Sequence, residues 1–202
     1  MKYAKSIPKT DLKRRESLLS KGWQPVKEAP NLLIAIVLSF PFMIMNALIT
    51  YFVLRLINPN SAAQVIHIIT APSWEFTIRY DYLLYLILLV LVHEFLHLIC
   101  IPNFYKSTET FWGIRPWGVF VYTNQELRKS RFLVISMVPF ITLSILIPAI
   151  LGLLGFLNVF ILVLVFFNAI ACSVDMLNFF TILVQVPGGS RIINNGFESY
   201  CM

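Results

Sequence analysis

The stretch that decides the fold reads YLLYLILLVLVHEFLHLIC over residues 82–100. Its first eleven residues are almost wholly apolar, and His93, Glu94 and His97 follow them. About 20 apolar residues suffice for a helix to cross a bilayer, so this stretch predicts a membrane-spanning helix. Residues four apart share one helical face, which lets both imidazoles reach one metal ion. Two packing histidines and a structural glutamate are the alternative, although ionisable groups within a span are costly and mark functional sites.

Composition extends this prediction to the whole chain. Of the 202 residues, 58% are hydrophobic and 13% are charged, whereas soluble domains carry about 25% charged residues. A soluble enzyme, a disordered chain and a nucleic-acid-binding protein are therefore excluded. Three more apolar runs cover residues 31–57, 132–156 and 159–186, and with residues 82–101 they predict an all-α membrane protein of four transmembrane helices. Prolines inside these runs are expected to kink their helices: Pro41, Pro139 and Pro148.

The basic residues set the expected orientation. Of the 16 Lys and Arg residues, eight precede the first span, five lie between the second and third spans, and one follows the fourth. By the positive-inside rule, both termini and the middle loop then lie in the cytoplasm. The expected organisation is a basic cytoplasmic segment (1–30), a four-helix membrane-embedded domain (31–186) and a cytoplasmic tail (187–202).

The motif predicts a zinc site that needs a third protein ligand. Catalytic zinc takes three protein ligands and leaves one position for water, and Glu94 is placed to act as general base on that zinc-bound water. Asp175 is the candidate third ligand, because it is the only acidic residue well inside the fourth span. His93 and His97 lie 12 and 16 residues after the outer end of their span, and Asp175 lies 17 residues after the outer end of its own. All three therefore reach depths of roughly 18–25 Å.

Two alternatives concern this ligand set. His67 is the remaining histidine, but it lies in the outer loop and does not reach the same depth. Asp175 could instead be a helix-packing aspartate that bonds to a neighbouring hydroxyl. A metal carrier usually has binding groups on both sides of the midplane, whereas these gather at one depth, which favours an enzyme.

Asn168 lies seven residues before Asp175 and shares its helical face. Its amide could bind the backbone of a substrate or a developing oxyanion. An ordinary hydrogen bond between helices explains it equally well, so both interpretations stay open.

These residues resemble those of the intramembrane zinc metalloproteases of the site-2 type, which place a His-Glu-x-x-His motif in one span and an asparagine and an aspartate in a later one. The size of the chain and the segments FVYTN (120–124) and MVPF (137–140) are more similar to a family of uncharacterised bacterial membrane proteins regarded as zincin metallopeptidases. The resemblance covers about residues 85–180. The usual site-2 pattern has a proline after the asparagine and a glycine after the aspartate. Here no proline follows Asn168 before the aspartate, and Met176 follows the aspartate.

The resemblance implies zinc held by His93, His97 and Asp175, with Glu94 catalytic, in the cytoplasmic membrane of a bacterium. The function expected is a zinc-dependent, membrane-embedded endopeptidase that hydrolyses peptide bonds near the cytoplasmic leaflet. Its expected partners are membrane lipids and a membrane protein or peptide substrate, without nucleic acid. The alternative is a non-catalytic metal-binding membrane protein, such as a carrier or a chaperone-like protein.

Three segments outside the spans carry further expectations. FWGIRPWGVFVYTN (111–124) predicts a short β-hairpin whose edge could hold an extended substrate by strand addition; an aromatic belt at the membrane interface is the alternative. TDLKRRESLLSKGW (10–23) could lie on anionic headgroups or serve only as the basic flank that sets topology. The outer loop, residues 58–81, is expected to be an interfacial connector that caps the site. Its notable residues are Trp74, Glu75, Arg79 and Tyr80.

Overall fold

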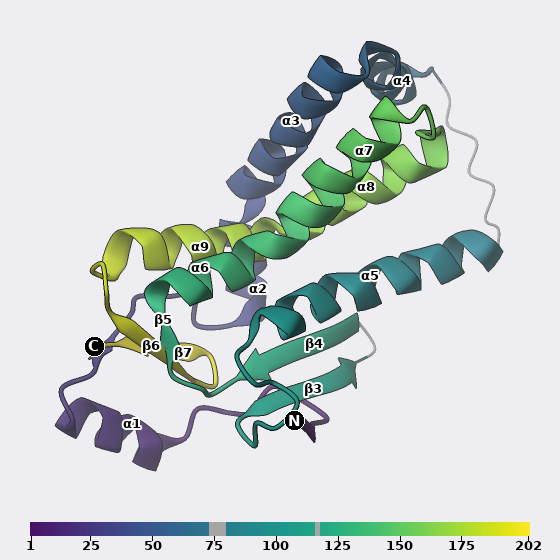
Figure 1. Cartoon of the computed structure of the whole chain (residues 1–202). Helices are drawn as coiled ribbons and strands as arrows, with labels where there is room; N and C mark the ends of the chain where they lie inside the picture. Colours follow the sequence, from purple (N-terminus) through teal and green to yellow (C-terminus); the bar gives the residue numbers. More distant parts are fainter. Residues whose placement is uncertain (73–79, 116–117) are drawn as a thin grey trace. The chain divides into compact units, whose positions relative to one another are not determined.

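Figure 1 shows the computed structural model of the chain, which describes residues 1–72, 80–115 and 118–202. The chain forms two compact units, and each is described by itself. The sheet unit comprises Met1–Ser39, Glu94–Val138 and Val174–Met202. The helix unit comprises Phe40–His93 and Pro139–Ser173. Each unit therefore combines segments that are distant in the sequence.

The helix unit contains long apolar helices. Helix α8 packs against α3, α4 and a π-helical segment, η1. The contact is apolar, because Leu54, Val65 and Leu162 are buried where these helices meet. The bounds of the elements are α3 Phe40–Ile57, α4 Pro59–Thr70, η1 Phe140–Leu146, α7 Ile147–Leu153 and α8 Val159–Ala171, together with the first part of α5 Tyr80–Cys100.

The sheet unit contains two small sheets and several helices. One sheet has the strand order β1-β3-β4 and the other β2-β7-β6-β5. The strands are β1 Lys2–Tyr3, β2 Gln24–Pro25, β3 Thr110–Arg115, β4 Gly118–Thr123, β5 Leu127–Arg128, β6 Arg191–Asn195 and β7 Glu198–Cys201. The helices are α1 Leu12–Ser20, α2 Leu32–Leu38, α6 Lys129–Pro139 and α9 Ser173–Gln185, together with the end of α5.

The hairpin predicted within residues 111–124 is confirmed. Strands β3 and β4 pair antiparallel, with Trp112 opposite Val121 and Arg115 opposite Gly118. Pro116 of the predicted turn lies outside the described residues. The C-terminal residues 187–202 form a second hairpin, β6–β7, which the sequence analysis treated only as a tail.

Four stretches of helix are long and apolar enough to cross a membrane within the described part of the chain: Phe40–Ile57, Tyr80–Cys100, Lys129–Leu153 and Val159–Gln185. The predicted number of spans is confirmed at this level of length and composition. Only 6% of the apolar window of α5 is buried inside the protein. The remaining apolar surface is what a bilayer would cover, so the structure fits a multi-pass membrane protein.

Three predicted features of the spans differ in detail. The first run, residues 31–57, is broken at Ser39, and α2 precedes α3 as a separate helix. Pro41 explains the break, because a proline lacks an N–H group and its ring clashes with the preceding turn. The fourth run is broken at Cys172, between α8 and α9. In the third run, the helix changes to π-helical geometry directly after Pro139.

The outer loop is more regular than the sequence analysis expected, because α4 occupies half of it. Asn58 caps this helix by accepting a hydrogen bond from the Ser61 N–H at 3.1 Å, and Pro59 takes the first helical position. Trp74, Glu75 and Arg79 lie outside the described residues, so the expected cap over the site has no structural description. Tyr80 is the first residue of α5.

Candidate metal centre

The His-Glu-x-x-His motif lies on the continuous helix α5, within its last two turns. His93 and His97 are therefore one turn apart and project from one face of the helix. Each ring nitrogen must be assigned a role, because only a nitrogen without a proton can bind a metal ion. The partners of the two Nδ1 atoms settle that assignment.

His97 belongs to the sheet unit, and its ring is held from α6. Its Nδ1 atom lies 2.8 Å from the carbonyl oxygen of Ile135. A carbonyl can only accept, so Nδ1 carries a proton and Nε2 is the nitrogen that can bind a metal ion. This Nε2 atom lies 3.5 Å from the carboxylate oxygen Oδ2 of Asp175. Both side chains are mostly buried, with exposed fractions of 12% for His97 and 23% for Asp175.

The distance between His97 and Asp175 suits two ligands of one ion. Two donors about 2.1 Å from a tetrahedral zinc ion lie roughly 3.4 Å apart. The sequence analysis paired these residues by depth alone, and within the sheet unit the structure brings them together. Asp175 is the third residue of α9 because the helix begins anew after Cys172. A carboxylate in the first helical turn is stabilised by the positive end of the helix dipole.

His93 belongs to the helix unit, where Asn168 of α8 holds it. The Nδ1 atom of His93 lies 3.0 Å from Oδ1 of Asn168. The Nδ2 atom of Asn168 donates to Ser144 Oγ at 2.9 Å and to the carbonyl of Pro139 at 3.4 Å. Since that carbonyl can only accept, the amide nitrogen must face it and Oδ1 must face His93. His93 is thus held with a proton on Nδ1, as His97 is, so Nε2 is the nitrogen that can bind a metal ion.

Both the oxygen and the nitrogen of the Asn168 amide therefore have hydrogen-bond partners within the helix unit. The residue is almost fully buried, with 1% of its surface exposed. The interhelical hydrogen bond was one of its two expected roles, and this contact reaches a motif histidine. Sequence reasoning missed Ser144 and the Ile135 carbonyl. The MVPF segment, residues 137–140, was nevertheless singled out, and it supplies the Pro139 carbonyl.

Glu94 follows His93 on α5 and points to the sheet. Its Oε2 atom accepts a hydrogen bond from the backbone N–H of Val121 in β4, at 3.0 Å. Glu94, His97 and Asp175 line one cavity of about 220 Å³, whose lining residues all belong to the sheet unit. Residues of β4, including Phe120 and Val121, form another wall of this cavity. The cavity therefore combines the expected general base, two of the three expected ligands and a strand.

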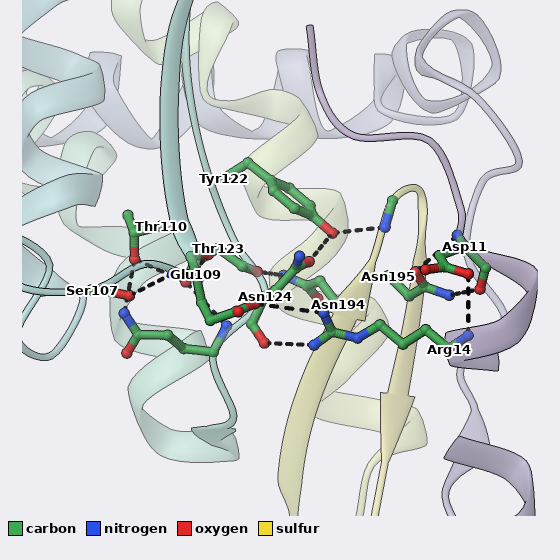
Figure 2. Close-up of polar contacts among 12 residues, drawn as sticks. Asp11, Arg14, Ser107, Glu109, Thr110, Tyr122, Thr123, Asn124, Asn194 and Asn195 are labelled. Carbon is green, nitrogen blue, oxygen red and sulfur yellow. Dashed lines mark hydrogen bonds and ion pairs between the residues drawn. The ribbon is translucent and has the colours of Figure 1, made fainter. Parts of the chain in front are cut away.

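A network of hydrogen bonds holds strand β4 in place (Figure 2). The hydroxyl of Tyr122 accepts a hydrogen bond from the Gly196 N–H at 2.7 Å, and the side chain of Asn194 donates to the Thr123 carbonyl at 3.1 Å. From the N-terminal segment, Arg14 donates to the carbonyl of Asn124 at 3.1 Å. Burial raises the pKa of Tyr122 to about 12, so its hydroxyl keeps its proton at neutral pH. Residues near both ends of the chain thus hydrogen-bond to β4 or to Asn124, which follows it.

His67 lies on α4 of the helix unit and is exposed. Among the described residues, the side chains that could group around a metal ion do not include it. This agrees with its exclusion on depth.

Fold and site together define a class of protein: within its described residues, the chain has four helices apolar enough to cross a membrane, one of which carries two histidines and a glutamate in the His-Glu-x-x-His pattern. Residues 86–191 match the family described as "Putative zincin peptidase". This match covers half of the chain, and the chain belongs to that family. It matches no protein with curated annotation and no solved structure. Family membership indicates a zinc-dependent metallopeptidase, in agreement with the resemblance drawn from the motif.

Proposed function

We propose that this protein is a zinc-dependent, membrane-embedded endopeptidase of the site-2 type, which hydrolyses peptide bonds near the cytoplasmic leaflet. The observation that carries the proposal is the pairing of His97 with Asp175. The Nε2 atom of His97 faces a carboxylate oxygen at 3.5 Å, while its Nδ1 proton is already bonded to a carbonyl. A metal ion bound at this place would replace a proton between Nε2 and the carboxylate.

The proposed ligands are His93 and His97, which lie one turn apart on α5, and Asp175, which lies beside His97 in the sheet unit. Two neutral imidazoles and one carboxylate suit zinc at a catalytic site, since this set leaves a position open. The Nδ1 hydrogen bonds to Asn168 and Ile135 are the outer contacts that fix ring orientation in such sites. When bound, zinc supplies Lewis-acid activation of a water molecule and of the scissile carbonyl.

Glu94 moves the proton in this proposal. Its carboxylate lines the same cavity as His97 and Asp175, so it can take a proton from the attacking water. It then delivers that proton to the amide nitrogen of the leaving group. The hydrogen bond from the Val121 N–H fixes one oxygen of this carboxylate.

Strand β4 supports an extended substrate. It lies at the edge of the sheet β1-β3-β4 and pairs with β3 on one side only. Val121 directs its N–H away from β3, to Glu94, so this edge of the strand faces the proposed catalytic group. A peptide must leave its helical conformation before hydrolysis, because helical carbonyls are hydrogen-bonded. Strand addition to β4 would hold it extended beside Glu94.

The test is Glu94→Gln, which keeps the size and the hydrogen-bonding ability of the side chain but cannot accept the proton. We expect normal zinc content and no peptide cleavage. The measurement is a comparison of the membrane proteomes of cells with wild-type protein and with the variant, followed by cleavage of a candidate substrate in the same membranes. Zinc is determined on the same preparations.

Two controls make the result decisive. Glu16→Gln removes a carboxylate from the exposed face of α1 and should leave cleavage unchanged. Cleavage by Glu94→Gln at the wild-type rate would exclude the mechanism. Bound zinc without any cleavage by the wild type would instead favour the non-catalytic metal-binding protein.

A further inference from the structure

A second cavity of about 240 Å³ lies in the sheet unit, where its lining residues all belong. Glu28, which follows β2 in the chain, is the one charged residue among those that line it. Apolar side chains form most of the remaining wall, among them Leu32, Phe132 and Phe197. An acidic group in a mostly apolar cavity suits a ligand with a long apolar stem and a cationic end.

The carboxylate of Glu28 is fixed in position. Its Oε2 atom accepts a hydrogen bond from the N–H of Ser199 at 2.8 Å. The N–H of Val26, two residues before Glu28, donates to the carbonyl of Ser199 at 2.9 Å. The Glu28 carboxylate therefore takes the place of the backbone carbonyl that would accept from the Ser199 N–H if the β2–β7 ladder continued. Within the part of the chain that the structure describes, the hydrogen bonds of Glu28 are to Ser199 and involve no Lys or Arg. Burial raises the pKa of this carboxyl group.

This cavity adjoins the one that contains Glu94. Four residues line both cavities: Tyr122, Phe132, Asn178 and Asn194. Asp175 lines the cavity that contains Glu94, which we call the metal-centre cavity. Asn178, three residues later on α9, lines both cavities. Three residues of helix rise by roughly 4.5 Å. The space beside Glu28 therefore begins within one helical turn of a proposed metal ligand.

We propose that the cavity beside Glu28 is a specificity subsite that binds a Lys or Arg side chain of the substrate. The inference rests on the proposed peptidase function. The apolar wall accommodates the methylene stem, and the fixed carboxylate accepts hydrogen bonds from the cationic end. An extended peptide advances by about 3.3 Å per residue, so the basic residue would lie within about two positions of the scissile bond.

Binding of short peptides to full-length, zinc-loaded Glu94→Gln protein in nanodiscs tests the subsite without requiring catalysis. The probes are N-acetylated peptides with one internal Lys and the same peptides with norleucine, which has the stem without the charge. We expect Glu28→Gln, added to Glu94→Gln, to weaken binding of the Lys peptides by about tenfold or more, as for a desolvated charge pair. Binding of the norleucine peptides should not change. Gln keeps an acceptor for the Ser199 N–H, so the β2–β7 ladder remains.

The other outcomes overturn the proposal. Equal effects on both peptide series, or no effect on either, would make Glu28 a structural residue only. The norleucine peptides are also tested with a free N-terminus, and loss of binding confined to that series would assign the carboxylate to a terminal ammonium group instead. As the matched control, Glu16→Gln should change neither series.

Failure of the subsite and failure of the peptidase are distinguishable. If wild-type protein cleaves Lys and norleucine peptides alike, with and without Glu28→Gln, the peptidase stands and the subsite falls. If Glu28 governs Lys binding but wild-type protein cleaves neither series, the site binds cationic peptides and the peptidase proposal falls.

Discussion

At the scale of single residues, the two motif histidines are prepared in the same way by different partners. Nδ1 of His97 is bonded to a backbone carbonyl, and Nδ1 of His93 to the amide oxygen of Asn168. In both rings Nδ1 therefore carries a proton, and Nε2 is the nitrogen that can bind a metal ion. Two structural histidines would not need to share one tautomer.

The ligand set can be tested by single substitutions. We expect His93→Ala, His97→Ala and Asp175→Ala each to lower zinc affinity by at least about 100-fold, because loss of a ligand should exceed the cost of losing an outer contact. Elemental analysis of purified protein, after dialysis against a chelator of known affinity, measures the effect. His67→Ala is the matched control and should retain one zinc per chain. Zinc loss in His67→Ala with retention in Asp175→Ala would assign the third ligand to His67.

Substitutions of Asn168 can distinguish a role in positioning His93 from a role in binding the substrate. If it orients His93, Asn168→Leu should weaken zinc binding by about 10–100-fold. Asn168→Asp should restore most of it, since a carboxylate also accepts from Nδ1. Asn60→Leu removes an exposed amide from α4 and should not affect zinc. Normal zinc affinity in Asn168→Leu, combined with a raised KM, would instead support the expected contact with the substrate backbone.

At the scale of elements, breaks in the spans and strands outside them position the chemical groups. The break at Cys172 begins α9 two residues before Asp175 and so places this carboxylate in a first helical turn. The change to π-helical geometry after Pro139 lies where Ser144 and the Pro139 carbonyl receive the amide of Asn168. Strand β4 brings a backbone N–H to Glu94. Each of these features positions a group that makes a contact in the proposed site.

The bracing of β4 predicts the effect of Tyr122→Phe. This substitution removes the acceptor of the Gly196 N–H while keeping the ring. A buried donor left without its partner costs about 1–3 kcal/mol, so thermal stability should fall by that order. Amide exchange at Val121 should become faster, as measured by hydrogen–deuterium exchange. Tyr105→Phe changes an exposed tyrosine and should do neither; unchanged exchange at Val121 in Tyr122→Phe would show that β4 is fixed without this contact.

At the scale of the whole molecule, the basic residues are unevenly distributed among the segments that flank the four apolar helices. The basic residues concentrate before the first helix and between the second and third, and the outer segments hold few of them. In the sheet unit, both sheets are formed by the segments before the first helix, between the second and third helices, and after the fourth. From the positive-inside rule we expect the sheets and the proposed catalytic glutamate on the cytoplasmic side.

Reporter fusions test this orientation. A reporter joined after Arg131 and one joined at the C-terminus should both report a cytoplasmic location, because eight, five and one basic residues mark the three inner segments. A reporter joined in the outer loop after Thr70 should report the opposite side. An external signal from the C-terminal fusion would reverse the orientation and remove the depth match between the histidines and Asp175.

The sequence by itself determined the features that depend on local order and composition. Apolar runs of about 20 residues fix the number of spans, since the bilayer sets that length. The spacing of His93, Glu94 and His97 fixes their shared helical face, and the depth comparison selected Asp175. The β3–β4 hairpin was predictable because its strands are adjacent in the chain and are rich in aromatic and β-branched residues.

The tertiary structure alone decided what depends on segments far apart in the chain. The pairing of β2 with β7 joins residues near position 25 to residues near position 200, and strands of two to five residues carry too little pattern to be recognised by themselves. The tautomers of both histidines, the contact of Glu94 with Val121 and the position of Glu28 beside the metal-centre cavity likewise arise from such contacts. Spacing along a helix is local and readable, whereas the partner of a polar side chain is chosen by packing, because any donor brought within 3 Å of an acceptor can satisfy it.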